Sequence, residues 1–109
     1  MDLKRLPKNP VEITIGMIGC KWKILIIKEL LSGTMRFSEI KKSLKGITQK
    51  VLTTKLRELE EIGLLVRNQE KSKVEYTLTD VGYTLLPVIS AMNDWGKDYK
   101  KYQKLLAHN

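Results

Sequence analysis

The spacing of apolar residues changes abruptly at Gly63. Between Thr48 and Gly63, Leu52, Leu56 and Leu59 recur three and four residues apart, which is the period of an amphipathic helix. Beyond Gly63 apolar and polar residues alternate, which is the period of half-buried strands. The alternating apolar positions are Leu64, Val66, Val74, Tyr76 and Leu78. A helix followed at once by a β-hairpin leaves few folds open to a chain of 109 residues, the usual size of one domain.

A helix-turn-helix is predicted over residues 38–63. Ser38 is expected to cap a short helix after the extended segment MRF, and Thr48 to cap the longer one. A turn containing Gly46 joins the two helices. The hairpin of residues 64–79, whose polar tip is expected at Asn68–Lys73, would be the wing of a winged helix-turn-helix. The predicted fold class is therefore mainly α with a small β-hairpin wing.

The segment before the helix-turn-helix divides into an arm and two helices. Residues 1–10 contain two prolines among charged residues and are expected to form a mobile arm or a strap. From Val11 the apolar period is helical, with Gly19 as a candidate end. A second helix is expected from about Lys21 to Leu31. Residues 11–33 are thus predicted to serve the core and a dimer contact.

One apolar stripe runs along the predicted C-terminal helices, residues 80–109. Pro87 is expected to kink this segment, and Gly96 is a candidate break. A domain this small cannot easily bury these helices together with the N-terminal ones, so a homodimer is expected, with packing in the monomer core as the alternative. The predicted dimer interface comprises Ile13, Met17, Val88, Met92, Trp95 and Tyr99. Trp95, Tyr99 and Tyr102 could instead line a pocket for a small-molecule effector between subunits.

The charge of the chain points to a polyanionic partner. A net charge of +8 and a pI near 9.6 favour nucleic acid first and an anionic membrane second. No apolar run is long enough to span a bilayer. The lone Cys20 excludes a disulfide within the chain, which fits a cytoplasmic protein. With one cysteine and one histidine, His108, no zinc site is expected, and no cofactor is predicted.

Catalytic motifs are missing from the sequence. It contains no GxSxG and no glycine-rich phosphate loop, and its only histidine lies one residue from the end. The acidic residues fall on predicted solvated helix ends rather than in pairs suited to acid–base catalysis. We therefore predict that the protein is not an enzyme.

The outward face of the predicted helix 48–63 is polar and basic. With Leu52 toward the core, Lys50, Thr54 and Arg57 point almost directly away, and Thr53 lies to one side. Cations occupy its first two-thirds and glutamates its end, so DNA would attract the amino end. Lys50 or Arg57 could donate to guanine edges or phosphates, and Gln49 to an adenine edge. A solvated face with ordinary charge pairs, such as Arg57 with Glu61, is the alternative.

Three stretches resemble the HxlR-type winged helix-turn-helix regulators. They are KWKILIIKELLSGTMRFSEIKKSL, GITQKVLTTKLRELEEIGLL and VEYTLTDVGYTLLPVISAMNDWG, and the resemblance spans roughly Pro10 to Gly96. It implies a dimeric bacterial transcription regulator, related to the MarR group, that binds double-stranded DNA at a palindromic operator. The helix 48–63 would lie in the major groove and residues 68–74 on the flanking backbone. The implied DNA contacts are Arg36, Thr48, Gln49, Lys50, Thr53, Thr54, Arg57, Lys71 and Lys73.

Two features depart from that family. Several members sense oxidants through a cysteine where this chain has Asn9, and Cys20 stands where the family often has glycine. Cys20 adjoins Lys21 and Lys23, whose charges could activate it as a redox thiol, whereas a packed, inert cysteine is the alternative. The wing tip, NQEKSK, is also short and lacks proline.

Two other functions fit the same face. The protein could be a general nucleic-acid binder, or a winged-helix module that binds an acidic protein. The charge division along Lys50–Glu61, together with the basic wing, favours DNA, because a protein-only module needs neither feature.

Overall fold

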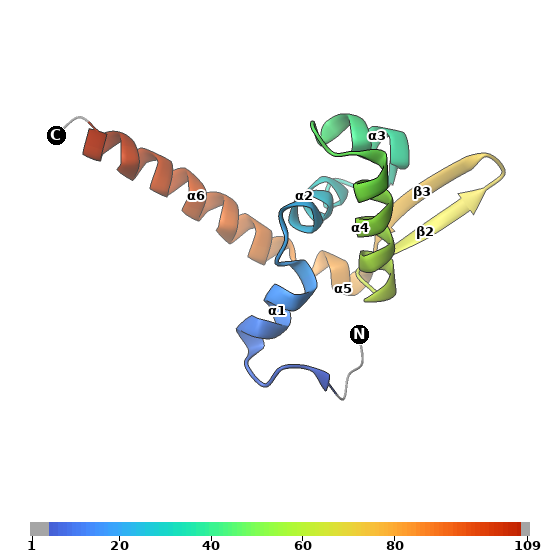
Figure 1. The fold of residues 1–109 in the computed structure, drawn as a ribbon, viewed down its shortest axis with the longest axis horizontal. Helices are drawn as coiled ribbons and strands as arrows, with labels where there is room; N and C mark the ends of the chain where they lie inside the picture. Colours follow the sequence, from blue (N-terminus) through green and yellow to red (C-terminus); the bar gives the residue numbers. More distant parts are fainter. Residues whose placement is uncertain (1–4, 108–109) are drawn as a thin grey trace.

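The computed structural model describes residues 5–107, in which a helical body carries two projections (Figure 1). The hairpin of β2 and β3 extends from one side and the long helix α6 from the other. In chain order the elements are α1 (Pro10–Ile18), α2 (Lys21–Leu30), β1 (Met35–Arg36), α3 (Phe37–Ser43), α4 (Gln49–Glu61), β2 (Leu65–Glu70), β3 (Lys73–Leu78), α5 (Asp80–Tyr83) and α6 (Leu86–Ala107).

The core lies where α2, α3 and α4 meet the sheet. Leu52, Leu56 and Leu59 of α4 are at most 1% exposed, as the helical period predicts. They share one apolar cluster with Ile26, Ile27 and Leu30 of α2, Ile40 of α3, and Leu65, Tyr76 and Leu78 of the sheet. No polar or charged residue of the described chain is buried with them. This cluster fixes which side of α4 faces outward.

Local capping sets both ends of α4 as predicted. The Thr48 hydroxyl oxygen accepts a hydrogen bond from the backbone N–H of Val51 at 3.1 Å. Gly63 follows the helix with φ of 80°, a left-handed conformation that glycine adopts without strain. The prediction that Ser38 caps α3 is wrong. Arg36 occupies the N-cap position, and the Glu39 carboxylate accepts from its backbone N–H at 2.9 Å.

The wing is a three-stranded sheet of order β1-β3-β2, rather than the predicted two-stranded hairpin. Met35 and Arg36 are too short a run to show a strand period, but they pair with Tyr76 and Glu75 of β3. The predicted tip at Asn68–Lys73 is also wrong. Both strands continue almost to the end, and only Lys71 and Ser72 form the turn.

The register of β2 differs by one residue from the prediction. Val66 was expected to face the core, yet it is 42% exposed, whereas Leu65 is 1% exposed and pairs with Leu78. The run Leu64-Leu65-Val66 is apolar throughout, so its pattern allows either register. A one-residue shift exchanges every side chain between the two faces of a strand. Arg67, which pairs with Tyr76, therefore lies on the face toward α4.

The C-terminal segment contains two helices. Thr79 caps the short helix α5, where its hydroxyl accepts from the N–H of Gly82 at 3.1 Å. The predicted kink at Pro87 and break at Gly96 do not occur. Pro87 is the second residue of α6, where a proline lacks no helix hydrogen bond, and α6 continues through Gly96 for 22 residues. Only Ile89 of α6 is buried.

Replacement of Gly82 by alanine should destabilise the fold, because a Cβ there would overlap the carbonyl oxygen of Leu64. We expect a loss of about 1–3 kcal/mol, as for overpacked cores. Gly96→Ala is the matched control, since its Cβ meets nothing within 4 Å and α6 should gain about 0.5–1 kcal/mol. Thermal unfolding measures both. Equal effects of the two substitutions would contradict the close packing of α5 on Leu64.

Candidate DNA interface

Polar side chains on the outer side of α4 separate into two rows. Gln49, Thr53 and Arg57, four residues apart, line a groove of about 490 Å³ between α4 and the wing. Lys50 and Thr54 are exposed and lie outside that groove. The structure thus brings part of the predicted set into contact with the wing and leaves the other part on the open surface of α4.

The two threonines of α4 already donate hydrogen bonds within the helix. The Thr53 hydroxyl donates to the carbonyl oxygen of Gln49 at 2.8 Å, and the Thr54 hydroxyl to that of Lys50 at 2.9 Å. A phosphate oxygen can only accept. Each threonine must therefore give up its helix bond before it can bind a phosphate, which favours apolar contact with a thymine methyl group.

A second hollow, of about 380 Å³, brings Arg36 and Lys73 together. It lies between the start of α3 and the end of the wing, and Ser38 and Ser72 also line it. Lys71 is next to it in the turn, with φ of 57°. A lysine seldom adopts this conformation, which glycine and asparagine accept more readily. The predicted phosphate contacts thus gather at one end of the wing.

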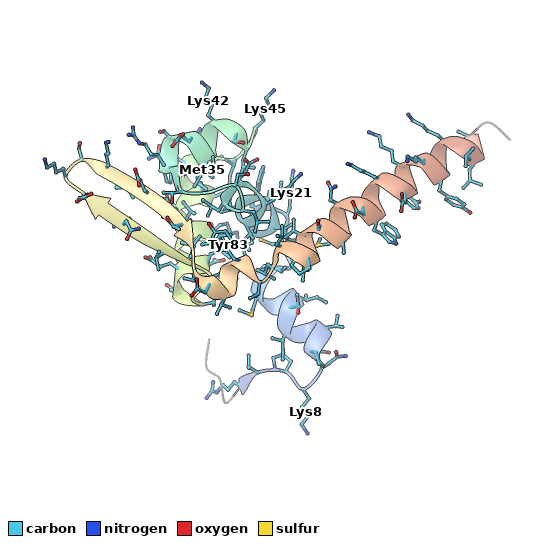
Figure 2. All side chains as sticks on the ribbon, turned by 180° about the vertical axis from the view of Figure 1, so that it is seen from behind. Lys8, Lys21, Met35, Lys42, Lys45 and Tyr83 are labelled. Atoms are coloured by element: carbon cyan, nitrogen blue, oxygen red, sulfur yellow. The ribbon has the colours of Figure 1, made fainter. Side chains whose placement is uncertain are left out.

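Three cations beside this surface were not identified from the sequence. Lys42 and Lys45 project side by side from the end of α3 (Figure 2). Arg67 of β2 lines the same groove as Arg57. The signal for Arg67 is the strand register: once Leu65 is assigned to the core, period-two alternation puts Arg67 on the same face.

Glu58 organises the charges at the middle of α4. Its carboxylate pairs with Lys23 of α2 at 2.9 Å and with Lys55 at 3.5 Å. The hydrogen bond from Lys23 is the largest cause that lowers the pKa of Glu58 below its ordinary value of 4.5, against a smaller opposing effect of burial. The alternative pair of Arg57 with Glu61 does not form, since these two ion pairs are the ones found within residues 5–107.

The residues considered for redox sensing act as helix caps. The Asn9 side chain accepts from the N–H of Val11 at 2.9 Å and caps α1. The half-buried Cys20 caps α2, with its sulfur 3.5 Å from the nitrogen of Lys23. The neighbouring cations are engaged elsewhere, because Lys21 lies 4.5 Å from the Trp22 ring centroid and Lys23 pairs with Glu58. These contacts favour the packed, inert reading of Cys20.

Apolar side chains of the predicted dimer interface are mostly exposed on the single chain. Ile13 and Met17 of α1 are half-buried. On α6 the exposed fractions are 37% for Val88, 46% for Met92, 69% for Trp95 and 50% for Tyr99. The rings of Trp95 and Tyr99 stack with centroids 5.3 Å apart. Exposed aromatic stripes of this kind mark interaction surfaces.

The described residues offer no group of three or more metal-ligating side chains. Within the same range, no helix is long and apolar enough to cross a membrane. His108 lies outside the described residues.

A family model described as HxlR-like helix-turn-helix matches residues 17–104. The chain belongs to the HxlR family. It is 49% identical over 94 residues to the HTH-type transcriptional regulator YdeP of Bacillus subtilis (strain 168), which covers 84% of this chain and 73% of that relative. It is 42% identical over 97 residues to a transcriptional regulator of Methanothermobacter thermautotrophicus, with 86% and 74% covered.

Solved structures of HxlR-type and MarR-type regulators share the fold. The redox regulator HypR in its reduced form superposes with a TM-score of 0.82 at 38% identity, over 88% of this chain and 98% of that one. The mainly α winged fold is thus confirmed. Membership of the HxlR family makes the chain a DNA-binding transcriptional regulator and confirms the prediction that it is not an enzyme.

The pair of Lys23 and Glu58 should contribute a small, pH-dependent stability. Because folding lowers the Glu58 pKa, this contribution is full above the unfolded value and is lost as the pH falls through the folded one. Glu58→Gln should cost about 0.2–1 kcal/mol near neutral pH, since the carboxylate is partly exposed, and almost nothing at about pH 3. Urea unfolding at both pH values measures this. Glu61→Gln is the control, and an equal cost for Glu58→Gln at both pH values would contradict the pair.

Proposed function

We propose that two copies of this chain bind a palindromic operator, with one α4 in each of two successive major grooves. The observation that carries this proposal is the division of α4. Its leucines are fully buried, while Gln49, Lys50, Thr54 and Arg57 are exposed on the opposite side. The amino end of α4 carries the positive pole of the helix dipole as well as Lys50, and both attract a phosphate backbone.

The α4 residues and the wing have different roles in this proposal. Lys50 and Gln49, at the exposed amino end of α4, read base edges. Arg36, Lys71 and Lys73, at the far end of the wing, bind phosphates and carry no sequence information themselves. Because DNA is the partner, the protein acts in the cytoplasm, where a bacterium holds its DNA.

The dimer forms through α1 and α6. A helix that buries one residue, Ile89, out of 22 gains little from its own chain, and its apolar side needs a partner. A second α6 supplies the same stripe, as two-fold symmetry requires. Two-fold symmetry also relates the two copies of α4, which a palindromic site requires to lie about 34 Å apart.

Loss of charge at the wing tip should weaken binding to all DNA sequences alike. Lys71→Asn removes the charge but suits the left-handed turn, so the hairpin keeps its shape. We expect the slope of log K against log salt to flatten by about 0.9, the value for one phosphate contact. Fluorescence anisotropy on operator and random duplexes measures it, with Lys101→Gln on α6 as the control. A loss confined to one sequence would contradict a phosphate role.

A charge in the α6 stripe should dissociate the dimer. Trp95→Glu places a carboxylate at the most exposed aromatic position of the stripe, and we expect a monomer with operator affinity reduced at least about tenfold. Sedimentation velocity gives the oligomeric state. The control is Val66→Glu, a similarly exposed apolar position on the wing. A Trp95→Glu protein that remains dimeric would show that α6 is not the interface.

A further inference from the structure

An arginine occupies a core-facing position of the wing. On β2 the residues facing α4 are Leu65, Arg67 and Gln69, which pair with Leu78, Tyr76 and Val74 of β3. Leu65, Tyr76 and Leu78 are buried. Arg67 thus follows a core leucine on the inner face of the strand, but its own side chain is exposed in the groove between the wing and α4. A guanidinium is an unusual choice for an inward strand position.

Arg57 of α4 lines the same groove from the opposite wall. Within the described residues, neither arginine makes an ion pair or a side-chain hydrogen bond. Glu60 is the one acid among the residues that line the groove, and it is not within 4.0 Å of either guanidinium. Two cationic groups therefore face one hollow without a partner from their own chain.

The groove has the size and the walls of an anion site. Its volume of about 490 Å³ exceeds what one phosphate needs, and its floor contains the apolar side chains of Phe37, Leu56, Val74 and Tyr76. Apolar walls limit screening by water, so a charge-assisted hydrogen bond is stronger there than on an open surface. Gln49 and Thr53 add polar groups beside the two arginines.

We infer that Arg57 and Arg67 together bind a single backbone phosphate of the operator, held between α4 and the wing. This inference rests on the proposed DNA-binding function and deepens it. Each guanidinium can donate two parallel hydrogen bonds to phosphate oxygens, which a lysine cannot do. One shared phosphate joins the reading helix to the wing, so it sets the depth and the register of α4 in the major groove.

The shared phosphate has a distinctive signature in salt titrations. The slope of log K against log salt counts the phosphates neutralised, about 0.9 for each. Arg57→Gln and Arg67→Gln should each lower operator affinity about tenfold while the slope changes little, because the other arginine still binds the phosphate. Only the double variant should flatten the slope by about 0.9. Its loss in affinity should also differ from the sum of the single losses.

The controls separate this inference from simpler explanations. Lys55→Gln removes a charge from α4 outside the groove, where Glu58 engages it, and should have a much smaller effect on affinity. Glu60→Gln removes the repelling carboxylate and should raise affinity for operator and random DNA alike. If instead the arginines hold Glu60 in place, Glu60→Gln would lower affinity and the melting temperature. Arg67→Lys preserves the charge and serves if Arg67→Gln does not fold.

The outcomes also distinguish this inference from the proposed function. If the wild-type protein binds DNA in a salt-sensitive way but each arginine variant flattens the slope by about 0.9, the arginines bind separate phosphates and the inference is wrong. Unchanged affinity in both single variants would overturn it as well, without harm to the function of α4. A wild-type protein that binds no DNA at low salt would overturn both.

Discussion

Leu52, Leu56 and Leu59 are each at most 1% exposed, and their contact with α2 and the sheet fixes the rotation of α4 about its axis. Everything on the outer side follows from that rotation. Because side chains four residues apart share a face, Gln49, Thr53 and Arg57 face the wing groove and Lys50 and Thr54 the open surface. Loss of one of these leucines would therefore disturb the DNA contacts as well as the stability.

The wing extends the same surface to a second element. Its inner face packs on the core through Leu65, Tyr76 and Leu78, so the hairpin is attached firmly at its base and projects at its tip (Figure 1). Cations lie along its whole length, from Arg67 beside α4 to Lys73 beside Arg36. Meanwhile α6 projects from the far side of the body, where a second copy can bind without covering α4.

Features governed by local chemistry could be predicted from the sequence. The helix α4 was predicted at nearly its observed length, because an amphipathic period, a threonine cap and a left-handed glycine act within a few residues. The register of β2 could not, since Leu64, Leu65 and Val66 are all apolar and only contact with the body selects Leu65. That shift hid Arg67 and the groove. Pro87 was misread because a helix boundary just before it, set by the chain's turn after α5, makes the same residue harmless.

Hydroxyl-radical footprinting of the DNA upstream of this protein's own gene tests the account most directly. A dimer that places each α4 in its own major groove should protect two patches about 10 base pairs apart, symmetric about a dyad. The protection should weaken as salt is raised, because phosphate contacts release counterions. One isolated patch, or uniform weak protection equal to that on a random duplex, would contradict a symmetric dimer that reads an operator through α4.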